Sequence, residues 1–527
     1  MTSTLVNDME NEYDQYLNDE SRTVGKADYI SFPTSEDDIV KIVSYAKKNN
    51  EKVTVQGALT GITAGAVPKG GIILNVSKMN KITGLRYDEG KKCFLLSIQP
   101  GVLLSEVRKA LDNLDFDTKE WSDDSTNALK LLQKSGKWFF TPDPTEASAS
   151  IGGMAACNAS GARSFYYGPT RNYIDSARIV LSDGSKVKLR RGVDKVKNLK
   201  FTVKTDSGKE VKGQLPYYVM PDVKNASGYY VKKDMDLLDL FIGSEGTLGI
   251  ITEMEIQLTP LPNQIWGVTS FFPSEKCAID FVYAVREAKL DVKVAAIEYF
   301  NNKALNLIRK QKEITMAFSQ MQDLLPNYHT AIYVELHGDT YEELSKAMLK
   351  IGELIVKCGG NEKDNWLATN PINLERLIAF RHATPECVNL IISERKKKNP
   401  HITKLGTDMA VPDSELKGIV DYYDDSISQS GLQAVMFGHI GSNHIHVNIL
   451  PRGDNDYNKG KSMYLKWSDH VVGLGGTISA EHGVGKLKTA MLVEMYGKDN
   501  IEKMRAIKKI FDPDSILNSG NIFKSEN

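Results

Sequence analysis

Two short segments of the chain hold residues that could bind a metal ion and move a proton. They are FGHIGSNHIHVNIL (437–450), which contains His439, His444 and His446, and SAEHGVGK (479–486), which contains Glu481 and His482. Imidazole is the commonest metal ligand in proteins and the usual general base near neutral pH. The pattern predicts a divalent-metal site at His439, His446 and Glu481, with His482 as the base. Buried histidines satisfied by hydrogen bonds are the alternative.

Length and composition limit the class of protein. A chain of 527 residues is too long for one compact core, so two to four domains are expected. The net charge of −1 argues against a nucleic-acid-binding surface. The five cysteines include no CxxC pair, which argues against an iron–sulfur cluster and fits a reduced, cytoplasmic setting. No run approaches the roughly 20 apolar residues of a membrane span, and the acidic N-terminus is not typical of a signal peptide.

The hydrophobic pattern indicates an α+β fold rather than a regular βαβ series. Ser35 is typical of a helix cap, because Ile39, Ile42, Val43 and Ala46 follow it at helical spacing. β-Strands are expected at 52–55, 73–76, 93–98 and 177–189, the last as a hairpin that turns at Asp183-Gly184.

Other segments carry weaker signals. The polar stretch 119–136 is expected to be an inserted excursion, and the charged stretch 190–212 is expected to be a loop. Two prolines in 258–262 predict a domain boundary.

Three glycine-rich stretches in the N-terminal half favour a phosphate-bearing cofactor. They are 57–66, 148–168 (SASIGGMAACNASGARSFYYG) and 243–249 (GSEGTLG). Glycine lets the backbone approach a ligand closely and point its N–H groups at phosphate oxygens. Ordinary turns are the alternative for any one stretch. Neither GxGxxG nor GxxxxGK[ST] occurs, so a Rossmann site or a P-loop is poorly supported.

With these motifs the chain resembles the FAD-dependent D-2-hydroxyacid dehydrogenases, flavoproteins of the vanillyl-alcohol-oxidase type. Five motifs in the family's order carry the resemblance: TPDPTEASASIGGMAACNASG, FIGSEGTLGIIT, GHIGSNHIHVN, AEHGVG and IFDPDSILNSGNIF. The resemblance implies a two-subdomain FAD-binding domain at 1–262. It also implies a cap domain with a helix-covered antiparallel sheet at 263–480, and a C-terminal segment, 481–527, that returns to the FAD domain.

The resemblance also implies which residues contact FAD. These are Gly57, Thr60, Gly61 and Gly65 in the pyrophosphate loop, then Pro142, Asp143, Ser150, Gly152, Gly153, Asn158 and Gly161, and finally Gly246, Gly249 and Ile250. Some relatives tether FAD through a histidine where Thr60 stands, so FAD is expected to be non-covalent. The family's Arg-Gly-x-Gly start is Gln56-Gly57-Ala58-Leu59 here, so one Arg and one Gly are missing.

In the C-terminal half, His439, His446 and Glu481 match the family's metal ligands, for Zn, Fe or Mn, and His482 matches its base. Arg381 matches an arginine that binds the substrate carboxylate, a task that suits its planar fork, and Asn448 matches a substrate-contacting asparagine.

Two positions depart from the family pattern. His444 replaces an asparagine, and spacing alone would allow it to bind metal with His446, because residues i and i+2 of a strand share a face. The resemblance favours His439 and His446, which leaves His444 as a neighbour of the ligands or the substrate. Gly406 replaces a lysine of some dicarboxylate-oxidising relatives, which favours a monocarboxylate substrate because a buried, unpaired carboxylate is costly.

The expected reaction is FAD- and metal-dependent oxidation of a D-2-hydroxy acid to the 2-oxo acid, with D-lactate favoured. Electrons would pass to an electron-transfer flavoprotein, an iron–sulfur subunit or a quinone-linked complex. D-2-hydroxyglutarate or glycolate dehydrogenase, an oxidase, and an electron-transfer subunit without its own substrate are alternatives. Another is a redox-neutral transferase like alkylglycerone-phosphate synthase, which lacks the Glu–His pair and metal motif seen here.

Overall fold

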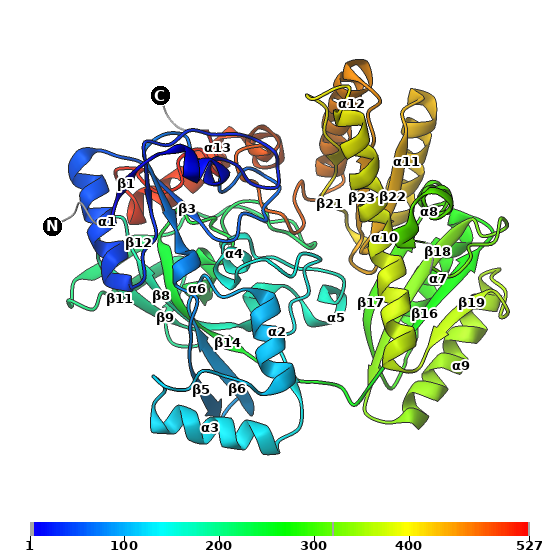
Figure 1. The fold of residues 1–527 in the computed structure, drawn as a ribbon, viewed down its shortest axis with the longest axis horizontal. Helices are drawn as coiled ribbons and strands as arrows, with labels where there is room; N and C mark the ends of the chain where they lie inside the picture. Colours follow the sequence, from blue (N-terminus) through cyan, green and yellow to red (C-terminus); the bar gives the residue numbers. More distant parts are fainter. Residues whose placement is uncertain (1–4, 319–320, 525–527) are drawn as a thin grey trace.

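The computed structural model describes residues 5–318 and 321–524, which form two lobes side by side (Figure 1). The first lobe holds a four-stranded and a five-stranded sheet, and the second lobe is built on one eight-stranded sheet. The mixture of helices and strands confirms the α+β class. Among the described residues, no helix is long and apolar enough to cross a membrane.

The four-stranded sheet lies near the N-terminus, in the order β1 (Asn7–Asp8), β2 (Tyr29–Ser31), β4 (Ile72–Asn75) and β3 (Val53–Gln56). Helix α1 (Glu36–Asn49) packs on it and begins after Ser35, whose hydroxyl accepts a hydrogen bond from the backbone N–H of Asp38 at 3.2 Å. Its buried residues are Ile39, Ile42, Val43 and Ala46, so the expected helix is confirmed.

The five-stranded sheet is antiparallel throughout. Its order is β5 (Ile82–Asp88), β6 (Cys93–Ile98), β14 (Ile250–Gln257), β8 (Ile174–Val180) and β9 (Lys186–Arg190). The expected hairpin is confirmed in β8 and β9, and Gly184 supplies the positive φ of +80° at its turn.

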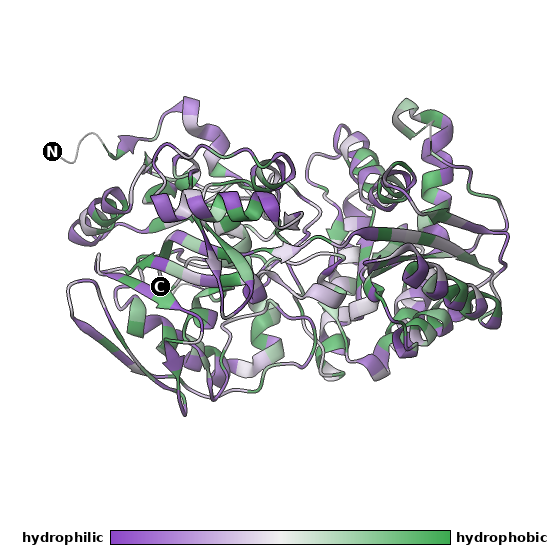
Figure 2. Ribbon diagram, turned by 90° about the horizontal axis from the view of Figure 1, so that it is seen from below, coloured by the Kyte–Doolittle hydropathy of each residue, from purple (hydrophilic) through white to green (hydrophobic). Residues whose placement is uncertain are grey.

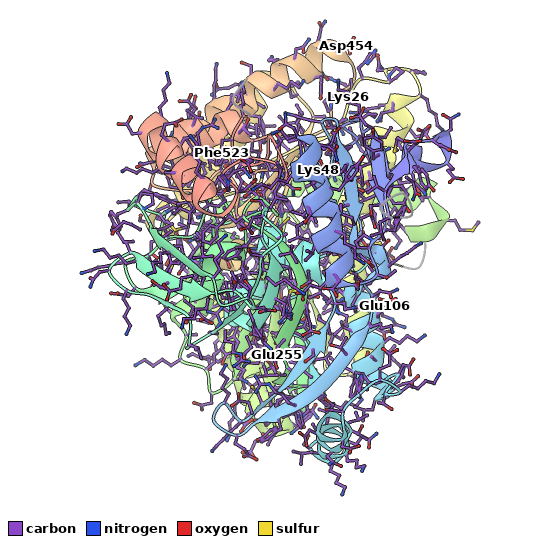
Figure 3. The ribbon with its side chains drawn as sticks, turned by 90° about the vertical axis from the view of Figure 1, so that its left-hand side faces the viewer. Lys26, Lys48, Glu106, Glu255, Asp454 and Phe523 are labelled. Atoms are coloured by element: carbon purple, nitrogen blue, oxygen red, sulfur yellow. The ribbon has the colours of Figure 1, made fainter. Side chains whose placement is uncertain are left out.

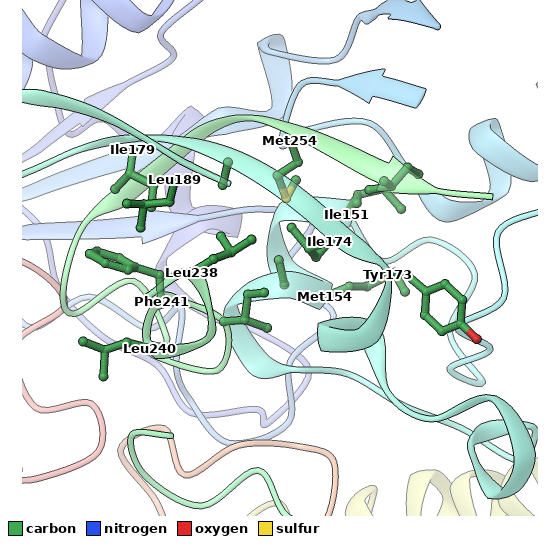
Figure 4. Close-up of a cluster of buried hydrophobic side chains, with 14 of the residues drawn as sticks. Ile151, Met154, Tyr173, Ile174, Ile179, Leu189, Leu238, Leu240, Phe241 and Met254 are labelled. Atoms are coloured by element: carbon green, nitrogen blue, oxygen red, sulfur yellow. The ribbon is translucent and has the colours of Figure 1, made fainter. Parts of the chain in front are cut away.

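Short helices pack on this sheet and form the core of the first lobe. They are α2 (Leu104–Asn113), α3 (Asp123–Lys134), α4 (Ile151–Cys157), α5 (Ser164–Tyr167) and α6 (Leu238–Phe241). Figure 4 shows Ile151 and Met154 of α4 gathered with Ile174 of β8 and Met254 of β14. This core fixes α4 and the loop that follows it.

Two segments differ from expectation. The polar excursion at 119–136 contains α3, which buries Leu129 and Leu132. The expected loop at 190–212 is wrong, because it holds strands β10 (Lys195–Val196) and β11 (Lys200–Lys204) and the start of β12 (Glu210–Gln214). Lysines on the solvent face of β11 alternate with buried Phe201 and Val203. The high charge of the segment conceals this period-two pattern.

The second lobe contains the eight-stranded antiparallel sheet. Its order is β19 (Asn365–Ala368), β16 (Gln264–Phe272), β18 (Thr330–Gly338), β17 (Lys293–Phe300), β22 (Ala434–Gly438), β23 (His444–Ile449) and β20 (Leu405–Gly406), and β21 (Met409–Ala410) also pairs with β23. Short strands β7 (Trp138–Phe139), β15 (Thr259–Pro260) and β13 (Met235–Asp236) make separate pairs.

Helices cover both faces of this sheet. One face packs on α7 (Glu275–Glu287), α9 (Tyr341–Lys357), α11 (Leu416–Ser430) and α12 (Asp454–Gly473), and the other on α8 (Asn302–Ile314) and α10 (Pro371–Lys396). In Figure 2 the surface helices carry green and purple segments in alternation, as expected for helices with one buried face.

The end of the chain packs on the first lobe. Helix α13 (Thr489–Phe511) lies over this lobe in Figure 1, and Phe511 packs against Phe241 of α6. Leu517 bridges to Val53 of β3, and Figure 3 shows Phe523 on the same side of the molecule as Lys48 of α1. The residues before α13, including 479–486, therefore connect the two lobes.

Candidate functional site

A tight turn brings the histidines of the first motif together. Strand β22 ends at Gly438, a 3-10 turn spans Ile440–Ser442, and β23 returns from His444. This reversal places His439 beside His446, with ring centroids 5.5 Å apart. The motif is therefore a strand–turn–strand unit near one end of the second lobe's sheet, next to the short strands β20 and β21.

The second motif places one carboxylate oxygen among three imidazoles. Glu481 Oε1 lies 3.4 Å from His439 Nε2, 3.3 Å from His446 Nε2 and 3.6 Å from His482 Nε2. Ligand-type atoms of His439, His444, His446 and Glu481 all lie within 4.8 Å of one another. The residues predicted to bind a metal thus come together, and two imidazoles with a carboxylate suit a divalent ion. We call His439, His446, His482 and Glu481 the histidine cluster.

In His439 and His446 the ring nitrogen that faces away from Glu481, Nδ1, also has a polar partner. His439 Nδ1 lies 2.7 Å from Glu298 Oε1, and His446 Nδ1–H donates to the Thr407 carbonyl at 2.9 Å. In known metal sites such partners orient the histidines and leave the other ring nitrogen, here Nε2, available to a metal ion. Sequence reasoning missed Glu298, although it is the one acidic residue in the apolar strand KVAAIEYF.

The charges around the cluster favour the ionised form of Glu481 and the protonated form of His439. Burial raises the pKa of Glu481, but Lys224, His439 and His444 outweigh it and hold that pKa well below its usual value. Burial lowers the pKa of His439, but Glu298 and Glu481 prevail and raise it to about 9. The carboxylate is therefore ionised, and a metal ion at His439 must displace a proton.

His444 is buried beside the cluster, with a hydrogen bond at Nδ1 and a carboxylate close to Nε2 but not aligned for a hydrogen bond. Its Nδ1 lies 3.2 Å from Lys224 Nζ, and its Nε2 faces Asp408 Oδ1 at 3.1 Å. Because an ammonium can only donate, Nδ1 must be the acceptor and Nε2 must carry the proton. Burial, His446 and Lys224 hold the pKa of His444 well below its usual value. This arrangement favours the interpretation of His444 as a neighbour of the ligands.

Asp408 joins the segment that carries Glu481 and His482 to the second lobe. Its carboxylate accepts from the backbone N–H groups of Glu481 at 3.2 Å and His482 at 3.0 Å, and from Lys488 Nζ at 2.8 Å. It also lies 3.3 Å from His482 Nδ1. Burial raises the pKa of Asp408, but His482 and Lys488 hold it well below its usual value. Sequence reasoning did not assign Asp408 to the site.

The two residues predicted to bind substrate lie near this cluster. The side chain of Arg381 in α10 is 11% exposed, and its guanidinium lies 4.0 Å from the carboxylate of Asp143. Asp143 already accepts from Arg108 at 2.6 Å. Asn448 follows His446 by two residues on β23, and its amide has no hydrogen-bond partner in the part of the chain that the structure describes. Both groups can accept a further ligand.

A cavity of about 310 Å³ in the first lobe is lined by all three glycine-rich stretches. Ten of the residues predicted to contact FAD line it: Gly57, Thr60, Gly61, Gly65, Ser150, Gly152, Gly153, Gly246, Gly249 and Ile250. Glu481 and His482 also line it. The cavity for the cofactor and the histidine cluster therefore share a wall.

Four other residues predicted to contact FAD, Pro142, Asp143, Asn158 and Gly161, are not among the cavity's lining residues. Asn158 ends α4 in the left-handed conformation, and its side chain accepts from the Arg171 N–H at 3.0 Å. A Cβ on Gly161 would lie 1.7 Å from the Asp143 carbonyl oxygen. Asn158 and Gly161 thus shape the loop behind the cavity wall.

Glu245 links the motifs GSEGTLG and AEHGVG by hydrogen bonds. It belongs to GSEGTLG, and its carboxylate accepts from the N–H groups of Val484 at 2.6 Å and Gly485 at 2.8 Å. The segment that carries Glu481 and His482 is thereby fixed to the cofactor loop as well as to Asp408.

Comparisons with known proteins agree with this architecture. Residues 262–522 match the family described as FAD linked oxidases, C-terminal domain, and residues 27–121 and 126–190 match the FAD binding domain. The chain is 27% identical to a D-lactate dehydrogenase of Anaerostipes hadrus, over 98% of this chain and 94% of that protein. It is 26% identical to a D-2-hydroxyglutarate dehydrogenase of Stutzerimonas stutzeri, over 94% of this chain and 90% of that protein.

A solved structure of alkyldihydroxyacetonephosphate synthase has a TM-score of 0.60 and 15% identity, and the match covers 98% of this chain and 82% of that one. This similarity shows the fold alone. The two family matches cover both lobes, and the cavity lies in the lobe that matches the FAD binding domain. The chain therefore belongs to the FAD-linked oxidases.

Proposed function

We propose that this protein oxidises a D-2-hydroxy acid to the 2-oxo acid, using non-covalent FAD and one divalent metal ion. The observation that carries the proposal is the shared wall, because Glu481 and His482 belong to both the histidine cluster and the cofactor cavity. A substrate held at the cluster would therefore lie against the flavin. The relatives named as D-lactate and D-2-hydroxyglutarate dehydrogenases support this class of reaction.

His439, His446 and Glu481 would hold the metal ion. FAD, when bound, supplies the hydride acceptor, and the metal ion supplies positive charge that lowers the pKa of the substrate hydroxyl. His482 takes the hydroxyl proton at Nε2, the ring nitrogen on the side of Glu481, while Asp408 faces Nδ1. Asp408 therefore holds the base in the orientation that proton transfer needs.

Arg381 and Asn448 would position the acid. The buried guanidinium of Arg381 lies 4.0 Å from the Asp143 carboxylate and 3.3 Å from His382 Nε2. It is therefore incompletely paired, and a substrate carboxylate would complete its pairing through two parallel hydrogen bonds. The free amide of Asn448 lies on the same strand face as His446 and would contact the hydroxyl or the carboxylate. Together they would set which face of C2 meets the flavin.

The surroundings favour a monocarboxylate, and we assign D-lactate as the substrate. Gly406 offers no cation, and a Cβ there would lie 3.0 Å from Asn448 Oδ1. Lys404 is turned to Asn389, to which it donates at 2.9 Å, and Lys224 is paired with Glu481. Neither lysine is therefore free to pair with a second substrate carboxylate. Electrons would leave the flavin to a separate acceptor, for which we propose an electron-transfer flavoprotein or an iron–sulfur subunit.

The test is anaerobic reduction of the bound flavin with a panel of D- and L-2-hydroxy acids, together with metal analysis of the same sample. D-Lactate should bleach the flavin fastest. A far higher kcat/KM for D-2-hydroxyglutarate would refute the substrate assignment. No bleaching by any 2-hydroxy acid would refute the oxidation itself and favour a redox-neutral reaction, such as that of the synthase with a similar fold.

A further inference from the structure

The two oxygens of Glu481 have different surroundings. Oε1 faces the three Nε2 atoms of His439, His446 and His482. Oε2 instead accepts from Lys224 Nζ at 2.7 Å and from Ser160 Oγ at 3.2 Å. Oε1 is thus directed at the imidazoles, and Oε2 is held by hydrogen bonds from Lys224 and Ser160.

We propose that Lys224 and Ser160 are positioning residues that present Glu481 to the metal ion as a one-oxygen ligand. The inference rests on the metal dependence proposed above and goes beyond the three ligands. It assigns a role to two residues that take no part in the expected ligand set, and it concerns the coordination number of the site.

The first argument is burial. The side chains of Lys224 and Glu481 are 10% and 8% exposed, so the pair is largely removed from water. If Glu481 rotated to bind the metal through both oxygens, Oε2 would have to leave Lys224 and Ser160. That movement would leave a buried ammonium without its carboxylate, which is strongly unfavourable. The buried pair therefore holds the carboxylate in its one-oxygen orientation.

The second argument is where the donors come from. Lys224 lies between β12 and β13, and Ser160 follows α4, so both belong to the first lobe. The ligands His439 and His446 belong to the second lobe. Lys224 also contacts His444 Nδ1 at 3.2 Å, which fixes where its ammonium points. Two residues of the first lobe thus orient the Glu481 carboxylate toward His439 and His446 of the second lobe.

The chemical consequence would be that the protein leaves positions on a bound metal ion for other ligands. Two imidazoles and one carboxylate oxygen make three protein bonds, and catalytic sites of this kind keep further positions for water or substrate. A carboxylate bound through both oxygens would occupy one of them. A 2-hydroxy acid needs two positions, one for its hydroxyl and one for a carboxylate oxygen.

An ammonium beside a divalent cation also repels it, and the two effects predict opposite results for Lys224→Met. If positioning dominates, the variant should bind metal about 10–100-fold more weakly, as is typical when a partner of a ligand is lost. If repulsion dominates, the variant should bind metal more tightly.

The experiment uses full-length, FAD-loaded protein and measures Zn²⁺ affinity by chelator competition and the visible spectrum of bound Co²⁺. We expect weaker Zn²⁺ binding and an altered Co²⁺ spectrum in Lys224→Met, a smaller change in Ser160→Ala, and partial recovery in Lys224→Arg. Lys303→Met is the matched control, because Lys303 forms an ion pair of similar length, 2.6 Å, with Asp424 on the second lobe. Its affinity and spectrum should be unchanged.

Equal or tighter Zn²⁺ binding by Lys224→Met would overturn the inference, as would an unchanged Co²⁺ spectrum. If Lys224→Met loses FAD and is therefore misfolded, Ser160→Ala decides the question, because it removes a single hydroxyl. Failure of wild-type, FAD-loaded protein to bind any divalent metal would instead refute the proposed function. The two failures are thus distinguishable.

Discussion

Replacing Asp408 with asparagine should separate the orientation of the base from the stability of the fold. The Asp408 carboxylate is 1% exposed and lies 3.3 Å from His482 Nδ1 and 2.8 Å from Lys488 Nζ. Asparagine keeps the shape but loses the charge, and its amide can donate to Nδ1. That would place the imidazole proton on Nε2 and block the base.

The expected losses follow from these contacts. Loss of an oriented base should lower kcat about 10²–10⁴-fold. Removing one partner from a buried ion pair costs about 3–5 kcal/mol of unfolding free energy, because Lys488 keeps a buried charge without its carboxylate. Flavin reduction in a stopped-flow instrument measures the first loss, and thermal or denaturant unfolding measures the second.

A double variant distinguishes the two effects. Asp408→Asn combined with Lys488→Met removes the uncompensated ammonium, so stability should recover while kcat stays low. FAD and metal contents must match wild type in every sample. Recovery of kcat along with stability would refute the reasoning, because Asp408 would then act only through the fold. An Asp408→Asn variant with normal kcat would refute it equally.

Further predictions follow from the site. Acid precipitation should release FAD into the supernatant, because Thr60 stands where some relatives have the histidine that binds FAD covalently. Flavin that stays with the pellet would contradict this. His446→Ala should lose metal and keep FAD, and loss of both would mean that the fold was damaged. His482→Ala should lower kcat about 10²–10⁴-fold, whereas His444→Ala should keep flavin reduction. The reverse result would mean that His444, not His482, is the base. The pKa of His439 is raised from 6.5 to about 9, so this group stabilises the metal-free fold fully below pH 6.5 and loses that contribution as pH rises through 9. Metal binding must displace this proton, so apparent metal affinity should rise about tenfold per pH unit from pH 7 to 8 and level off around pH 9. Calorimetry in several buffers measures this, and a flat affinity would contradict it.

The sequence predicts the fold best where local signals agree. The cap at Ser35 with apolar residues at helical spacing, and Asp183-Gly184 between two β-type runs, each predict an element that the structure confirms. The prediction fails at 190–212, where lysines face water on one side of β11 while Phe201 packs on Phe511 from the distant C-terminal helix. Only the tertiary fold reveals that contact, so local composition could not indicate the strand.

Some residues of the candidate site could be predicted from the sequence, and others could not. Histidines that are clustered in sequence, such as His439 and His446, could be found because one strand–turn–strand unit carries both. Glu298 left a weaker signal, a single carboxylate in an apolar strand, which is costly to bury without a partner. Lys224 left none, because a lysine in a polar loop is ordinary until the fold places it 2.7 Å from Glu481.

The segment around Glu481 and His482 depends on both lobes at once. Asp408 holds its backbone N–H groups from the second lobe, and Glu245 holds Val484 and Gly485 from the first. Each contact is a carboxylate accepting two backbone N–H groups, which fixes the path of the chain as well as the side chains. Because Glu481 turns to the cluster and His482 lies beside the cofactor cavity, a shift of one lobe against the other would move both residues together. The relative position of the lobes therefore sets the distance between the proposed metal ligand Glu481, the proposed base His482 and the cofactor cavity, and neither lobe alone can specify this geometry.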